Sequence, residues 1–149
     1  MQLTQKETML LKDLKDQEKL CIDKYTDHAA KASDAQLKEL FTSLAATEQQ
    51  HYDTLTQIEK STPPTPGGTS KPMPTFKATY SMGETPEKKN DAYLCSDVLS
   101  AEKHVSSLYD TCIFEFTDEK CRQSLNHIQS EEQQHGKMIY DYMQANSMY

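Results

Sequence analysis

The sequence predicts an all-α protein, a four-helix bundle made of two helical hairpins joined by a long crossover. Apolar residues recur at helical spacing in four long segments, and a short break divides each half of the chain. The stretch 61–86 holds all six prolines and three of the four glycines. Most of this stretch therefore cannot be helical, and it separates the two hairpins.

Capping signals mark where the helices begin. Thr4 with Glu7 three residues later fits a capping box, and Thr85 precedes a proline suited to the first helical position. Asp34 and Asp118 each follow a short break and are favourable caps for the next helix. Helices are thus expected near residues 5–31, 34–59, 87–115 and 118–145.

The stretch 61–86 is long enough to run the height of a bundle, so the second and third helices are expected to lie parallel. This is the crossover topology of ferritin-like bundles. A linker between two independent hairpins is the alternative, but a lone hairpin buries too little apolar surface to be stable. We therefore expect a single domain over residues 1–149.

Composition excludes several classes of partner. The net charge of −7 argues against nucleic acid or an anionic membrane as the main partner. No apolar run is long enough to span a membrane, and the start MQLTQKETML does not resemble a secretory signal. The four cysteines form no C-x-x-C pair. They are expected to be buried reduced thiols, with a disulfide as the open alternative.

The two halves repeat at an offset of 84 residues. The tetrapeptide EQQH occurs at 48–51 and again at 132–135, and Glu18 and Tyr25 correspond to Glu102 and Tyr109. Apolar positions follow the same offset, so the chain carries an internal duplication that includes polar residues.

Each helix places one carboxylate on its buried apolar stripe, and two helices add a histidine one turn later. Four inward carboxylates require protons or counter-charge, and two divalent cations would balance them. The predicted ligands of this dinuclear site are Glu18, Glu48, His51, Glu102, Glu132 and His135. Glu18 and Glu102 are expected to bridge the metals. Oxygen and imidazole ligands favour iron or manganese, with zinc as an alternative.

Further polar residues lie on or near these stripes. Tyr25 and Tyr109 are interpreted either as hydrogen-bond donors to the ligating carboxylates or redox-active phenols, or as core aromatics. Cys21 could be a redox thiol, although an inert buried cysteine is the simpler reading. Glu131 is expected to be exposed. The other histidines, His28, His104 and His127, are not expected to be ligands.

The chain resembles the spore coat protein F family over nearly its whole length. The likeness rests on LTQKETMLLKDLKDQEKLCIDKY, on SDAQLKELFTSLAATEQQH and on the closing EEQQHGKMIYDYMQANSMY. This resemblance implies synthesis in the mother cell during sporulation and deposition in the spore coat, beside other coat proteins.

The site also looks like that of rubrerythrins and bacterioferritins, whose ligand set matches the six residues above. Two departures count against a rubrerythrin-type peroxidase cycle: the chain has no cysteine-rich rubredoxin module, and Val105 stands where rubrerythrins carry an additional Glu.

Three functions follow as hypotheses. The first is oxidative chemistry on O2 or peroxide, the second is a structural coat component whose metals stabilise the bundle, and the third is metal storage. A homo-oligomer is compatible with each of them.

Overall fold

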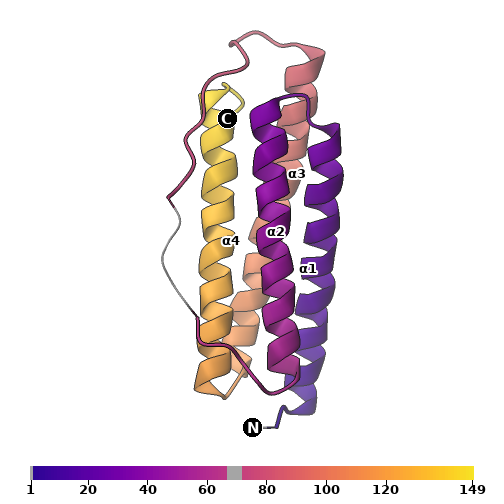
Figure 1. The fold of residues 1–149 in the computed structure, drawn as a ribbon, viewed down its shortest axis with the longest axis vertical. Coiled ribbons are helices and arrows are strands. Elements are labelled where there is room, and N and C mark those ends of the chain that lie inside the picture. Colours follow the sequence, from indigo (N-terminus) through magenta and orange to yellow (C-terminus); the bar gives the residue numbers. More distant parts are fainter. Residues whose placement is uncertain (1, 67–71) are drawn as a thin grey trace.

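The computed structural model describes residues 2–66 and 72–149, and the described chain is all-helical. It contains α1 (Gln5–Lys31), α2 (Ala35–Glu59), α3 (Pro86–Glu115) and α4 (Glu119–Ala145), with no strand in those two ranges. These bounds lie within one residue of the expected ones. The helices pack side by side as a four-helix bundle (Figure 1), which confirms the predicted fold class.

The helices begin where their caps place them. The Thr4 side chain accepts the N–H of Glu7, and the Glu7 carboxylate accepts the N–H of Thr4, which completes the expected capping box. The Asp34 carboxylate caps α2 and the Asp118 carboxylate caps α4. The caps satisfy amide groups that the first turn of a helix leaves without partners.

The described parts of the crossover lie beside α4, and α2 and α3 point in the same direction (Figure 1). Residues 67–71 of the expected crossover lie outside the described residues. Before them, Ser124 Oγ donates to the carbonyl of Pro64 at 3.0 Å. After them, Asn146 Oδ1 accepts the N–H groups of Thr79 and Tyr80 at 2.7 and 3.0 Å. These contacts attach the crossover to both ends of α4.

Each hairpin also forms hydrogen bonds with the turn of the other hairpin. Asp91, near the start of α3, accepts the N–H groups of Ser33 and Asp34 at 2.8 and 2.9 Å in the α1–α2 turn. Glu7, near the start of α1, accepts the N–H of Thr117 at 3.1 Å in the α3–α4 turn. The two contacts are related by the repeat of 84 residues. Together with the packing of α1 on α3, they show that the hairpins are not independent.

The core consists of two apolar clusters, one toward each end of the bundle, with the four expected glutamates at the level between them. The residues expected on the four buried stripes are buried, and all four cysteines are buried thiols. Within the described ranges, no helix has the length and apolar character that a membrane crossing requires.

Candidate metal centre

The six side chains expected as metal ligands meet at mid-height in the bundle. Glu18 comes from α1, Glu102 from α3, and each EQQH segment contributes a Glu and a His from α2 or α4. All six are at most 2% exposed. The spacing of three residues between Glu and His turns both side chains to the same side of their helix, so both enter the core.

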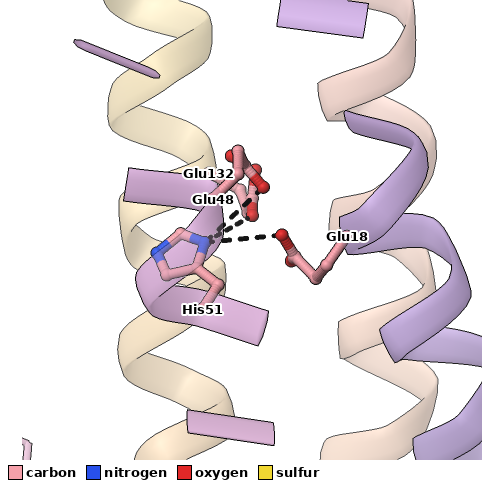
Figure 2. A group of neighbouring side chains, drawn as sticks. All are labelled: Glu18, Glu48, His51 and Glu132. Carbon is pink, nitrogen blue, oxygen red and sulfur yellow. Dashed lines mark hydrogen bonds and ion pairs between the residues drawn. The ribbon is translucent and has the colours of Figure 1, made fainter. Parts of the chain in front are cut away.

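The six residues form two overlapping groups that could each hold a metal ion. One group, drawn in Figure 2, contains Glu18, Glu48, His51 and Glu132, and the other contains Glu48, Glu102, Glu132 and His135. Within each group the nearest donor atoms lie within 4.8 Å of one another.

The sharing of carboxylates differs from the expected one. Glu48 and Glu132 belong to both groups, whereas Glu18 and Glu102 each belong to one. The expectation that Glu18 and Glu102 bridge the two positions therefore does not fit the geometry. The glutamates of the two EQQH segments lie between the groups instead.

Both histidines direct Nδ1 toward the carboxylates. His51 Nδ1 lies 3.0 Å from Glu132 Oε1, and Figure 2 shows Glu48 and Glu18 facing the same nitrogen. His135 Nδ1 lies 3.3 Å from Glu102 Oε1 and 2.8 Å from Glu48 Oε1. The rings stack with their centroids 5.8 Å apart. The two imidazole rings thus lie close together beside the carboxylate cluster.

The two tyrosines bond across the hairpins. Tyr25 of α1 donates to Glu102 Oε1 of α3 at 2.5 Å, and Tyr109 of α3 donates to Glu18 Oε1 of α1 at 2.6 Å. Both tyrosines also belong to the apolar core clusters, so they are core aromatics whose hydroxyls are satisfied by the site carboxylates, and both interpretations agree with this arrangement. Burial, together with the adjacent carboxylate, raises the pKa of both phenols, so both remain protonated donors.

Glu131 was expected to be exposed, and this expectation is wrong. Its side chain is only 30% exposed, and its Oε1 lies 2.9 Å from His51 Nε2 and 3.3 Å from His127 Nε2. The position just before Glu132 lies at the edge of the buried face, so a long side chain from it reaches the neighbouring helix. A carboxylate on the outer nitrogen of an imidazole orients the ring and fixes which nitrogen carries the proton.

The remaining candidates lie outside both groups. His28 Nε2 lies 2.7 Å from Asp97 Oδ2, His104 is exposed, and His127 contacts Glu131 rather than the cluster. Cys21 is 3% exposed, and burial raises the pKa of its thiol. A thiol that stays protonated is a poor nucleophile, which favours the inert reading of Cys21.

The cluster leaves several buried carboxylate oxygens without hydrogen bonds. In the described part of the chain, no hydrogen bond of good geometry reaches Glu18 Oε2, either oxygen of Glu48, Glu102 Oε2 or Glu132 Oε2, although His135 Nδ1 lies 2.8 Å from Glu48 Oε1. Buried polar atoms nearly always find partners, because an unpaired one costs about 1–3 kcal/mol, and more when it is charged. The donor groups of the protein itself therefore do not complete this site.

Burial also changes the proton affinity of the glutamates. It raises the pKa of Glu18 from 4.5 to about 8, and the neighbouring Glu48 carboxylate acts in the same direction. It likewise raises the pKa of Glu132 well above its ordinary value, with help from Glu102. These shifts mean that the cluster takes up protons when no cation is present.

The pKa values of the two histidines are also raised. Burial alone would lower the pKa of His135, but its contacts with Glu102 and Glu48 outweigh burial and raise that pKa from 6.5 to about 9. For His51 as well, contacts with Glu131 and Glu132 outweigh burial, and its pKa rises. Without a cation, protonated imidazole supplies part of the positive charge that the carboxylates need.

Residues 90–149 match the family model of the Coat F domain. The match covers less than half of the chain, in most of α3 and all of α4, and it includes Glu102, Glu132 and His135. No curated protein and no solved structure matches the chain significantly. The resemblance to spore coat protein F is therefore supported for the second hairpin.

The metal-free protein is expected to lose stability as pH rises from about 5 to about 9. Glu18 has a folded-state pKa of about 8 against 4.5 when unfolded, and His135 has about 9 against 6.5. Between those values the folded state binds more protons, so raising the pH favours unfolding. Melting temperatures measured in chelator at pH 5, 7 and 9 should fall in that order.

The matched control for this pH dependence is the double variant Glu18→Gln, Glu132→Gln, which removes two of the groups with raised pKa. Its melting temperature should change much less over the same range. A parent protein whose melting temperature is flat from pH 5 to 9 would contradict the clustering of these ionisable groups.

Proposed function

We propose that this protein is a ferritin-like four-helix bundle that holds two iron or manganese ions and performs oxidative chemistry on O2 or peroxide. The observation that carries the proposal is the set of buried carboxylate oxygens without hydrogen-bond partners, facing two histidine Nδ1 atoms. The proposed ligands are Glu18, Glu48, His51, Glu102, Glu132 and His135.

The residues present suit two divalent cations. Four carboxylates carry a charge of −4 when ionised, and two divalent cations supply +4, so the buried charge cancels. The imidazoles can then remain neutral and serve as ligands, as metal binding by histidine requires. Each of the two groups offers three carboxylates and one imidazole.

The donor set favours some metals over others. Magnesium and calcium prefer oxygen donors throughout, and structural zinc sites commonly include thiolates. Carboxylate with imidazole suits iron and manganese, both of which can change oxidation state. When bound, such a pair would supply the electrons for reducing a small oxidant.

The chain's own residues would orient and support that pair. Tyr25 and Tyr109 hold one oxygen each of Glu102 and Glu18, which leaves the second oxygen of each carboxylate without a protein donor. Glu131 fixes the His51 ring from outside. The apolar clusters on both sides keep bulk water from the carboxylates, so each fixed charge acts more strongly there.

We also propose that the protein is a component of the spore coat, with other coat proteins as its partners. The match of residues 90–149 to the Coat F domain supports this location. A purely structural role, in which the metals only stabilise the bundle, is the second candidate. It is favoured by the arrangement of the site, because every ligand group joins helices from both hairpins.

Metal binding should reflect the sharing of the glutamates. The purified protein is expected to bind two ions per chain. Glu18→Ala should weaken one of them and leave the other, because Glu18 belongs to one group only. Glu48→Ala should weaken both, because Glu48 belongs to both groups. Metal quantitation after gel filtration, with native mass spectrometry, checks these stoichiometries, and equal losses from the two variants would contradict the sharing.

Glu131 should affect one metal through His51. Glu131→Gln keeps the size of the side chain but replaces a charged acceptor, and the affinity of the group containing His51 is expected to fall by about 10–100-fold. The control is Glu119→Gln, an exposed position at the start of α4. Titration with Co²⁺ or Mn²⁺ should resolve one weakened site beside one unchanged site. Two unchanged sites would mean that Glu131 does not support the ligand.

A further comparison separates oxidative chemistry from a structural role. Protein loaded with iron or manganese is expected to consume peroxide or oxidise Fe²⁺, and Glu132→Ala should lose this turnover because it disturbs both groups. Tyr25→Phe leaves all six ligands in place and should keep its metal content. Oxygen or peroxide consumption per bound metal is the measurement. Fully loaded parent protein that is inert toward both oxidants would support the structural role instead.

A further inference from the structure

A groove opens on the surface between α3 and α4 and reaches the carboxylate cluster. Its volume is about 900 Å³, and Glu102 and Glu132 are among the residues that line it. Each glutamate exposes almost none of its surface in total, 2% for Glu102 and 1% for Glu132, so the two residues form the floor of the groove. The groove therefore leads from solvent to two of the proposed ligands.

Gly136 contributes to the lining of this groove. It follows His135 directly in the interior of α4, where glycine is unfavourable relative to alanine. A Cβ atom at this position would lie 3.6 Å from Leu99 Cδ1, an ordinary contact distance. An alanine would therefore fit, whereas a larger side chain would extend into the space beside Leu99.

The first hairpin shows what a larger side chain does at the equivalent place. At the offset of 84 residues, Gly136 corresponds to Tyr52 and Leu99 corresponds to Lys15. The Lys15 ammonium lies 5.0 Å from the centroid of the Tyr52 ring, and both side chains are partly buried between α1 and α2. In the first hairpin, the Lys15 and Tyr52 side chains thus fill the space that corresponds to the groove beside Gly136 in the second hairpin.

We propose that the α3–α4 groove is the route by which divalent cations enter and leave the site, and that Gly136 keeps this route open. This inference rests on the proposed metal-binding function. A hydrated cation must exchange its water for carboxylate oxygens, and Glu102 and Glu132 are the two proposed ligands that line the groove.

A second hollow, between α1 and α3, does not offer an equivalent route. It is smaller, about 200 Å³, and no glutamate is among its lining residues. The carboxylate that lines it, Asp97, is paired with Lys24 at 3.0 Å, and Cys21 also lines the hollow. The thiol of Cys21 stays protonated because burial raises its pKa, so it does not attract a cation as a carboxylate does.

The test measures the rate at which metal-free protein takes up Co²⁺, followed by its visible absorption in a stopped-flow mixer. The double variant Leu99→Lys, Gly136→Tyr copies the pair of the first hairpin into the groove. Loading is expected to slow by about tenfold or more, while two ions still bind at equilibrium. Gly136→Ala, which fits without displacement, is the matched control and should load at the parental rate.

Two further variants test whether slow loading of the double variant could come from misfolding or from a general loss of dynamics instead of from a filled groove. Gly136→Leu is a smaller change, and it should slow loading to an intermediate degree. Adding Lys15→Leu and Tyr52→Gly to the variant Leu99→Lys, Gly136→Tyr should open a groove between α1 and α2 in the first hairpin. Loading should then become faster again.

The outcomes distinguish this inference from the proposed function. Variants with a filled groove that bind two ions as fast as the parent would overturn the entry route and leave the metal site intact. Parent protein that takes up no Co²⁺ at equilibrium would overturn the metal site itself.

Discussion

The burial of four carboxylates in one core is the constraint on which the rest of this structure depends. Each ionised group would lose its hydration and repel the others, so the bundle is stable only with protons or cations among them. The surrounding residues agree with this need. Tyrosine hydroxyls donate to Glu18 and Glu102, and histidine nitrogens face Glu48 and Glu132.

The same constraint also links the two hairpins. The tyrosine of each hairpin donates to a glutamate of the other, and each proposed metal group takes ligands from both. At the ends of the bundle, Asp91 and Glu7 repeat this exchange through backbone amides of the opposite turn. An internal duplication therefore produces two halves that satisfy each other's buried polar groups rather than their own.

Most of the fold and of the site could be predicted because the signals were local and repeated. Caps at Thr4 and Asp34 mark helix starts, and the steps of three and four residues around Glu48 and His51 place both on the buried stripe. Knowing that four such stripes meet in one core was enough to bring together the six candidate ligands.

Features that depend on distances between helices could not be predicted in this way. The position of Glu131 on its helix indicates an exposed side chain. It reaches His51 only because α4 lies close to α2 at this height. The sharing of Glu48 and Glu132 depends on the relative heights of α2 and α4, which helical periodicity does not determine. A glycine in the interior of a helix, Gly136, was the one local signal of the groove.

The places where the two halves differ make the two metal groups unequal. Glu131, which replaces Thr47 of the first half, supports His51 and so stiffens the group that contains Glu18. Gly136, which stands where the first half has Tyr52, lines the groove beside Glu102 of the other group and Glu132 of both groups. The duplication provides the set of candidate ligands that the two groups share in kind, and these few substitutions give the two groups different surroundings.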